Sequence, residues 1–272
     1  MLRQKHYIEN ILKRFKLEGE KSYQTPMLPN TQLRSVIDQS PEEERAMEKI
    51  PYMNMVGALR YAADATRPDI AYVTGQLARH LQKYGLEHYN AAKHCMQYLK
   101  GTKELWLVLG GIEFTHITGY TDADGMATEG HKAILAYIFQ LARASLSWSS
   151  RRGDLVPASV YEGEIQALFQ GAKEAIWLKR FTHEVLGISN DPIMLHCDNQ
   201  AAIKTVLSEE MTFNAKTKHL DRRKDFIRDY IKEKYIDVKY VPTHDQRADI
   251  LTKALYTPQI KHLTDLLGLV RV

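Results

Sequence analysis

The strongest constraint on the fold is a change in apolar pattern near residue 104. Before it, apolar residues recur at helical spacing; after it come short alternating runs typical of β-strands. These runs are "LWLVLGG", "THITGYTDAD", "KAILAYIFQL" and "ASLSWSS". Turn-like breaks separate them, which predicts an antiparallel meander. The chain is therefore expected to have a helical N-terminal part followed by a part that contains a sheet.

The rest of the chain alternates between helix and strand. A long helix is predicted over residues 161–186, because Ile165, Leu168 and Ala172 recur at helical spacing. It is followed by a strand, two helices, a strand and a final helix, in the segments "IMLHCDN", "QAAIKTVL", "TKHLDRRKDFIRDYIKEKY", "IDVKYVPT" and "DQRADILTKAL". This order predicts an α/β domain in which helices pack on a mixed sheet.

Composition narrows the class of protein without naming a partner. The 272 residues allow one large domain or two modest ones, and 44% hydrophobic with 26% charged residues is ordinary for a globular chain. A net charge of +4 is too mild to indicate a polyanionic partner. Cys95 and Cys197 lie far apart, which argues against a disulfide scaffold or a thiolate zinc site and fits a reducing compartment. No apolar run approaches the length of a membrane span.

Several acids fall at the ends of the predicted elements. They are Asp122, Asp124, Glu162, Glu164, Asp198 and Asp249. Carboxylates that converge at one end of a sheet repel one another and need cations, and hard oxygen ligands favour Mg²⁺ or Mn²⁺. Two such ions about 4 Å apart can activate a water molecule and stabilise the leaving oxygen of a phosphodiester.

Each acid also has a purely structural interpretation. Asp122 and Asp124 are typical turn residues. Asp198 suits the cap of the helix that follows it. The remaining acids lie where negative charge favours a helix N-terminus. Spacing alone leaves both interpretations open.

A series of motifs resembles one family. The sequence is similar to the C-terminal part of the Pol polyprotein of Copia-type LTR retrotransposons. The matching stretches are "YMNMVGALRYAADATRPDIAYVTGQLAR", "AAKHCMQYLKGTKE", "GYTDADG", "SWSSRRGD", "AKEAIWLKR", "CDNQAAI", "TKHLDRRKDFIRD" and "VPTHDQRADILTKAL". They occur in the family's order and cover nearly the whole chain, so the series is far more specific than any single motif.

The resemblance implies two domains. Residues 1–104 would be a mainly helical reverse-transcriptase thumb/connection remnant, and residues 105–272 an RNase H-like domain with a mixed five-stranded sheet and flanking helices. The polymerase palm, with its Tyr-x-Asp-Asp strand, is absent, so this chain is not a polymerase as it stands. The implied activity is that of a metal-dependent endoribonuclease, a hydrolase that cleaves the RNA strand of RNA–DNA hybrids during retrotransposon replication.

The resemblance also assigns the site. Asp122, Glu164, Asp198 and Asp249 match the family's metal ligands, which hold two Mg²⁺ (or Mn²⁺) ions. Glu164 matches the family's helical glutamate in "YEGEIQAL", although helix phase places Glu162 nearer the apolar stripe. The choice between the two glutamates therefore comes from the resemblance.

Further residues are implicated outside the carboxylates. His244 lies in a loop where related nucleases place a histidine that helps the product leave. Basic and acidic residues interleave along residues 216–232, which is typical of a solvated, salt-bridged surface. In the nuclease interpretation, the phosphates of the hybrid are instead bound by Lys218, Arg222, Arg223 and Lys224.

Other expectations concern the long helix and its aromatic residues. Gly163 and Gly171 each weaken a helix by about 1 kcal/mol relative to alanine, which could leave the catalytic helix loose. Trp148 and Trp177 are expected in the core rather than as platforms for bases.

Two alternative functions stay open: a catalytically inactive nucleic-acid-binding remnant, and a structural subunit that supports a polymerase palm on another chain. The resemblance places the protein in a cytoplasmic retrotransposon particle or in the nucleus, with no membrane partner.

Overall fold

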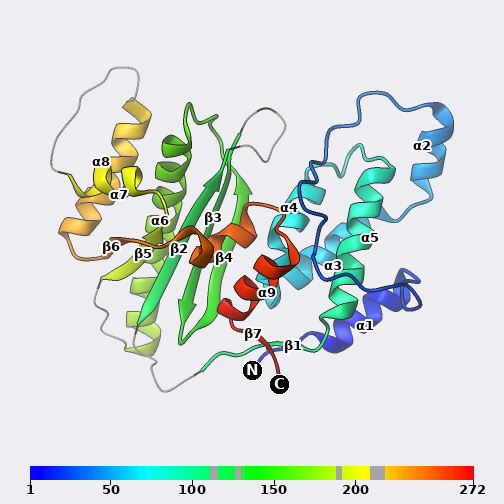
Figure 1. The fold of residues 1–272 in the computed structure, drawn as a ribbon, viewed down its shortest axis with the longest axis horizontal. Coiled ribbons are helices and arrows are strands. Elements are labelled where there is room, and N and C mark those ends of the chain that lie inside the picture. The colour runs from blue at the N-terminus through cyan, green and yellow to red at the C-terminus, as the bar shows by residue number, and fades with distance from the viewer. Residues whose placement is uncertain (111–115, 126–129, 131, 188–191, 209–217) are drawn as a thin grey trace. The chain divides into compact units, whose positions relative to one another are not determined.

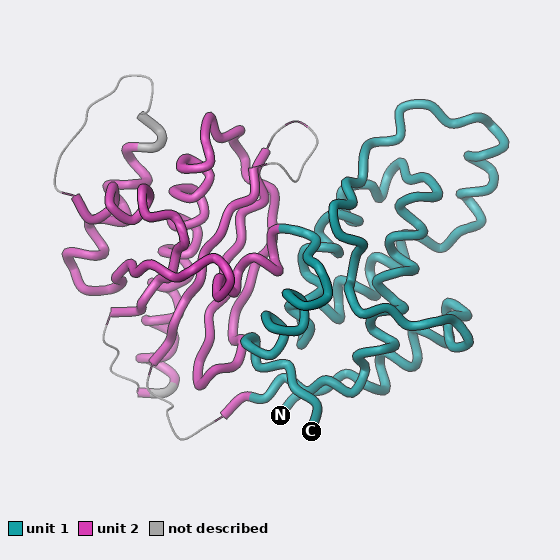
Figure 2. Tube along the Cα trace, viewed as in Figure 1, with its two compact units in different colours: residues 1–108, 253–272 teal, residues 109–252 magenta. Residues whose placement is uncertain are grey.

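The computed structural model describes residues 1–110, 116–125, 130, 132–187, 192–208 and 218–272, with the backbone alone at residues 186 and 218–220. The chain divides into two compact units (Figure 2). Unit 1 comprises Met1–Val108 and Lys253–Val272, and unit 2 comprises Leu109–Thr252. The sequence places the last residues in the C-terminal domain, whereas by contact Lys253–Val272 pack with the N-terminal helices.

Unit 1 is mainly helical. Its elements are α1 Lys5–Arg14, α2 Pro41–Glu48, α3 Tyr52–Ala65, η1 Pro68–Ile70, α4 Ala71–Ala78, α5 Leu86–Gly101, β1 Leu105–Leu107, α9 Thr257–Leu266 and β7 Leu269–Arg271. The amphipathic α1 buries Ile8, Ile11 and Leu12. Pro51 separates α2 from α3, because proline lacks the N–H that a continuous helix would need there.

The strand at "LWLVLGG" does not join the meander, so that part of the expectation was wrong. β1 pairs antiparallel with β7 in a separate two-stranded sheet, with Leu105 opposite Arg271 and Leu107 opposite Leu269. Alternation of apolar residues identifies a strand but not its partner, and here the partner is the last strand of the chain.

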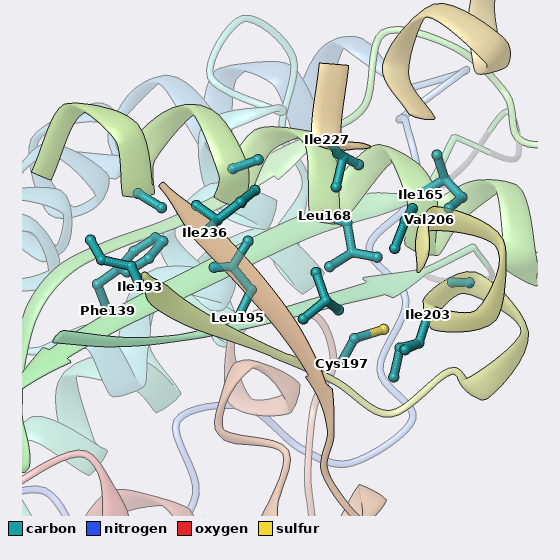
Figure 3. Close-up of a cluster of buried hydrophobic side chains, with 14 of the residues drawn as sticks. Phe139, Ile165, Leu168, Ile193, Leu195, Cys197, Ile203, Val206, Ile227 and Ile236 are labelled. Atoms are coloured by element: carbon teal, nitrogen blue, oxygen red, sulfur yellow. The ribbon is translucent and has the colours of Figure 1, made fainter. Parts of the chain in front are cut away.

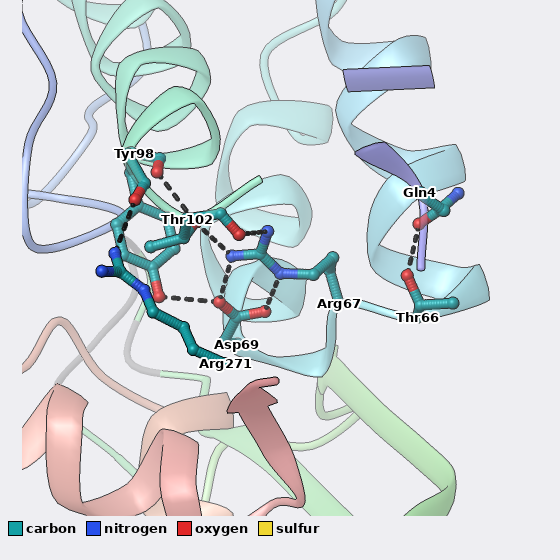
Figure 4. A network of polar contacts seen from close by, with 8 residues as sticks. Gln4, Thr66, Arg67, Asp69, Tyr98, Thr102 and Arg271 are labelled. Carbon is teal, nitrogen blue, oxygen red and sulfur yellow. Dashed lines mark hydrogen bonds and ion pairs between the residues drawn. The ribbon is translucent and has the colours of Figure 1, made fainter. Parts of the chain in front are cut away.

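A buried polar network holds the "TRPDI" segment of unit 1 to α5 (Figure 4). Arg67 forms a bidentate pair with Asp69, with Nε to Oδ1 at 2.9 Å and Nη2 to Oδ2 at 2.6 Å. Tyr98 donates its hydroxyl to Asp69 Oδ2, and Arg67 Nη2 donates to the hydroxyl oxygen of Thr102. The side chains of Arg67 and Asp69 are only 2% and 0% exposed, so each charge depends on the other.

Unit 2 is built on a mixed five-stranded sheet with flanking helices, which confirms the expected fold class (Figure 1). The strands are β2 Ile117–Asp124, β3 Ile134–Leu141, β4 Ala144–Arg152, β5 Ile193–Cys197 and β6 Ile236–Tyr240. Their order is β4-β3-β2-β5-β6. β2, β3 and β4 form the antiparallel meander, whereas β5 runs parallel to β2 and β6 parallel to β5.

The helices of unit 2 pack against the sheet. They are α6 Val160–Leu186, α7 Gln200–Leu207, α8 Lys218–Lys232, η3 Thr243–Asp245 and η4 Arg247–Leu251. The core lies where Ile165 and Leu168 of α6 meet Leu195 of β5, and Ile227 of α8 closes the same cluster (Figure 3). The helix predicted at "DQRADILTKAL" is the short 3₁₀ helix η4. No helix in these described ranges is long and apolar enough to cross a membrane.

The helix α6 is continuous through both of its glycines. A Cβ at Gly171 would overlap the Cγ2 methyl of Thr121 on β2, so glycine is needed for the close approach of helix and sheet. A Cβ at Gly163 would meet Ala123 Cβ at 3.4 Å, an ordinary contact. The expectation that Gly171 weakens the helix is therefore incomplete, because this glycine also allows α6 to pack closely against β2.

Candidate metal centre

Two acids leave the sheet at the carboxyl end of β2. Asp122 is 4% exposed and Asp124 is half-buried. Because side chains alternate along a strand, both lie on the face opposite Thr121, which packs against α6. Thr252 donates its hydroxyl to Asp122 Oδ2 and fixes that carboxylate.

Asp198 reaches the same edge from the neighbouring strand. Tyr120 of β2 lies opposite His196 of β5 in a parallel pair, so Asp122 and Asp198 each follow two residues after that pair. The Thr243 hydroxyl, in η3, donates to Asp198 Oδ2 at 2.9 Å. The strand register thus brings together two acids that are far apart in sequence.

The third aspartate comes from η4 rather than from a long helix. Asp249 is 3% exposed, and one carboxylate oxygen from each of Asp122, Asp198 and Asp249 lies within 4.8 Å of the other two. Gln246, which is fully buried, holds η4 against β2: its amide donates to the Thr121 carbonyl at 3.0 Å. Its side-chain oxygen accepts from the Ala248 N–H.

Glu164 joins the cluster from the start of α6. It is 3% exposed, and its carboxylate accepts a hydrogen bond from the Ala123 N–H of β2. A carboxylate oxygen of Glu164, the thiol of Cys197 and an oxygen of Asp198 lie within 4.8 Å of one another. Burial, followed by the charges of Asp122 and Asp198, raises the pKa of Glu164 to about 9. Without a cation, the cluster therefore favours a protonated, neutral Glu164 at neutral pH.

Glu162 has a different place. Its side chain accepts from the Ala158 N–H at 2.8 Å, and its own N–H donates to Ser159 Oγ at the N-cap of α6. These bonds stabilise the start of the helix. The structure thus brings Glu164, and not Glu162, to the other acids.

The donor set fits a hard cation. Carboxylate oxygens are the ligands that Mg²⁺ and Mn²⁺ prefer, and a cation would offset the repulsion that raises the pKa of Glu164. Burial also raises the pKa of the Cys197 thiol, so this sulfur stays protonated beside Glu164 at a distance of 3.7 Å. The four acids Asp122, Glu164, Asp198 and Asp249 could hold a metal ion.

His244 lies on the surface, and in sequence it precedes Asp249 of the cluster by five residues. Its side chain is 74% exposed, and Nε2 is 3.1 Å from Asp245. It directly follows Thr243, whose hydroxyl contacts Asp198. His244 is thus accessible to solvent at the loop that reaches the acids.

The basic helix α8 separates into different environments. Arg222 is exposed, and Arg223 is half-buried with its guanidinium 5.7 Å from the Phe169 ring centroid. Lys224 is buried and pairs with Asp221 at 3.2 Å, which leaves it poorly placed for a phosphate. The side chain of Lys218 lies outside the described residues.

The two tryptophans expected in the core are more exposed than a core position allows. Trp148 of β4 is half-buried, and Trp177 of α6 is 54% exposed. Trp177 follows the apolar stripe in sequence but lies on the outer side of α6, because Ile176 and Leu178 take the inward positions. The expectation for Trp177 was wrong.

Hydroxyl and amide groups around the acids were missed by sequence reasoning. Thr243, Gln246 and Thr252 are common polar residues in loops, and their role depends on which strand they reach. Their proximity to "ADILTK" was the available signal, since Gln246 and Thr252 both lie within three residues of Asp249.

Sheet order, flanking helices and buried carboxylates together define an RNase H-like α/β domain with an acidic site that could bind metal. No protein-family model matches the chain. Over 98% of its length it is 36% identical to the "Retrovirus-related Pol polyprotein from transposon TNT 1-94" of Nicotiana tabacum. Over 100% of its length it is 30% identical to the corresponding polyprotein from transposon RE2 of Arabidopsis thaliana.

Homologues over the whole chain are thus retrovirus-related Pol polyproteins from plant transposons. The chain spans only 20% and 18% of the lengths of the TNT 1-94 and RE2 polyproteins.

Solved structures of RNase H domains are similar to part of the chain. LC11-RNase H1, isolated from compost by a metagenomic approach, matches 51% of this chain and 93% of its own, with a TM-score of 0.39 and 16% identity. The complex of LC11-RNase H1 with RNA/DNA hybrid matches 50% of this chain and 93% of its own, with a TM-score of 0.38 and 15% identity. The fold assignment rests on the observed strand order and flanking helices.

Proposed function

We propose that unit 2 is a metal-dependent endoribonuclease that cleaves the RNA strand of RNA–DNA hybrids during retrotransposon replication. The observation that carries this proposal is the convergence of four acids from β2, α6, β5 and η4 at one edge of the sheet. Homology to retrovirus-related Pol polyproteins supports a role in retrotransposon replication.

The proposed cofactors are two Mg²⁺ or Mn²⁺ ions. Asp122, Glu164, Asp198 and Asp249 would hold them through carboxylate oxygens. When bound, such a pair supplies an activated water and stabilises the leaving oxygen of a phosphodiester, and hydrolysis would leave a 3′-hydroxyl and a 5′-phosphate.

The chain's own hydrogen bonds would keep the ligands in position. Thr252 holds Asp122, and Thr243 holds Asp198. Gln246 anchors η4, and therefore Asp249, to β2. His244, exposed beside Thr243, would help the product leave. Loss of the Thr252, Thr243 or Gln246 side chain would loosen a ligand without removing it.

The substrate would be recognised by shape. An RNA–DNA hybrid has 2′-hydroxyls on one strand only, which distinguishes it from duplex DNA and from duplex RNA. Arg222 and Arg223 would contact phosphates from α8, and Lys218, whose side chain lies outside the described residues, stays a predicted member of this group. Lys224 is the weakest member of this group, because it is buried and paired with Asp221.

A cleavage assay on a hybrid with a labelled RNA strand tests the proposal. The full chain would be incubated with Mg²⁺, Mn²⁺ or EDTA, and Asp198→Asn compared with Asp38→Asn, an exposed acid of unit 1. Cleavage with either metal, absent with EDTA and in Asp198→Asn but present in Asp38→Asn, is expected.

A folded chain that cuts no hybrid with either ion would contradict the proposal. Hybrid binding without cleavage would then favour an inactive nucleic-acid-binding remnant. Co-purification with a palm-containing chain would instead favour a structural subunit of a reverse transcriptase.

A further inference from the structure

The outer side of α6 carries two stacked, exposed aromatic rings. Trp177 is 54% exposed and Phe181 is 43% exposed. Their ring centroids are 5.1 Å apart and their planes differ by only 12°. Because residues four apart face the same way on a helix, the rings lie along one line of the helix surface. The pair presents flat apolar area to solvent.

Basic residues interleave with these rings. Phe169, Lys173, Trp177 and Phe181 recur every four residues, and exposed Arg180 lies about one turn after Trp177 and directly before Phe181. We call these five residues the α6 ridge. Lys173 Nζ is 5.0 Å from the Phe169 ring centroid, and Arg223 of α8 lies 5.7 Å from the same ring. Two cations therefore share one aromatic side chain.

The cations of the ridge are not neutralised by close acids. Among the residues that the structure describes, no carboxylate lies within ion-pair distance of Lys173, Arg180 or Arg223. Burial and then the charges of Arg151 and Arg223 lower the pKa of Lys173, with Asp154 acting in the opposite direction. Arg151 comes from β4, so three separate elements bring positive charge together here.

The combination of exposed aromatic rings and clustered cations limits the kind of ligand that fits the α6 ridge. An apolar protein surface would cover the rings but would leave clustered cations without partners. A duplex would satisfy the cations, but its bases are already stacked inside and cannot cover the rings. A single strand offers phosphates for the cations and free base faces for the rings.

We propose that the α6 ridge binds a single-stranded nucleic acid, with bases stacked on Trp177 and Phe181 and phosphates held by Lys173 and Arg180. Trp177 lies 13 residues after Glu164 on α6, which is on the order of 20 Å along the helix axis. The ridge is thus a second surface, outside the carboxylate site. Its binding does not require the proposed nuclease activity.

Fluorescence anisotropy of labelled oligo-dT, oligo-rU and duplex DNA tests the ridge, with EDTA present to prevent cleavage. Base stacking on one aromatic side chain contributes about 1–3 kcal/mol, so Trp177→Leu should weaken single-strand binding by about 5- to 150-fold. Trp177→Phe keeps a ring and should retain most of the affinity. Tyr61→Ala, which removes a 59% exposed aromatic residue of unit 1, should have no effect.

The charged part of the ridge has its own readout. Lys173→Gln and Arg180→Gln should each flatten the slope of log affinity against log salt by about 0.7 for a single strand. Phe181→Leu provides a second stacking variant, and thermal unfolding of every variant shows whether it remains folded.

Two results would overturn the proposal. One is an unchanged single-strand affinity in folded Trp177→Leu and Phe181→Leu. The other is self-association that Trp177→Leu abolishes while oligonucleotide affinity stays the same, because the ridge would then be an interface between copies of this chain. Asp198→Asn separates the ridge from the nuclease: it should lose cleavage and keep single-strand binding.

Discussion

Gly171 of α6 lies directly against Thr121 of β2, so closely that a Cβ at position 171 would overlap the Thr121 methyl group. Thr121 immediately precedes Asp122, and α6 also carries Glu164. The contact therefore sets the distance between the two elements that supply these acids. At position 171, helix propensity alone favours alanine, whereas packing against Thr121 requires glycine.

The two glycines of α6 should respond oppositely to alanine. Gly163→Ala should stabilise the fold by up to about 1 kcal/mol through helix propensity. Gly171→Ala should destabilise it by about 1–2 kcal/mol, because overpacking outweighs the same gain. Urea unfolding followed by circular dichroism measures both. Thr121→Ser removes the overlapping methyl and should restore part of the stability lost in Gly171→Ala; no recovery would contradict the packing explanation.

Glu164 and Glu162 should differ sharply in cleavage. Glu164→Gln removes a carboxylate that is proposed to ligate metal and should abolish hydrolysis of the hybrid. Glu162→Gln alters hydrogen bonds at the start of α6 and should cost mainly stability, at most about 1 kcal/mol. Initial rates at saturating metal rank the two variants. If Glu162→Gln proved the more damaging, the assignment of the helical ligand would be wrong.

Stability without metal should fall as pH rises. The pKa of Glu164 is about 9 in the folded protein and 4.5 as an ordinary glutamate. Between these values the folded state keeps a proton that the unfolded state has lost, so it binds more protons and becomes less stable with increasing pH. Unfolding in EDTA at pH 5, 7 and 9 measures the slope. Glu164→Gln should flatten it, whereas Glu162→Gln should leave it as in the wild type.

Arg222 and Lys224 should separate binding from stability. Arg222 is exposed, so Arg222→Ala should weaken hybrid binding and lower its salt dependence by a little under one unit of log–log slope. Lys224 is buried and paired, so Lys224→Ala should lower the unfolding free energy and change the salt slope little. Affinity measured across a salt series decides, with a denaturation curve for each variant. Equal slopes in wild type and Arg222→Ala would mean that α8 is a solvated surface and does not bind phosphates.

The buried pair in unit 1 should be sensitive to loss of one partner. Asp69→Ala leaves the Arg67 guanidinium buried without its carboxylate and should destabilise the chain by about 3–5 kcal/mol. The matched control is the Arg60–Asp64 pair, whose side chains are 53% and 56% exposed. Asp64→Ala should cost at most about 1 kcal/mol. Denaturation midpoints that shift equally in the two variants would contradict the importance of burial.

Local sequence patterns determined much of this protein. Helical spacing of Ile165, Leu168 and Ala172 predicted α6, and alternation predicted the strands of the meander, because both patterns depend on neighbours only a few residues apart. Family motifs then identified Asp122, Glu164, Asp198 and Asp249 as a set. Neither kind of information gives distances between side chains.

Tertiary structure decided what depends on partners far away in sequence. It paired β1 with β7, distinguished Glu164 from Glu162 by proximity to the acids, and required glycine at position 171. It also placed Trp177 outside the core, where neighbouring Ile176 and Leu178 are buried instead. Each outcome follows from which surfaces meet when the sheet and helices pack, and periodicity alone does not specify that.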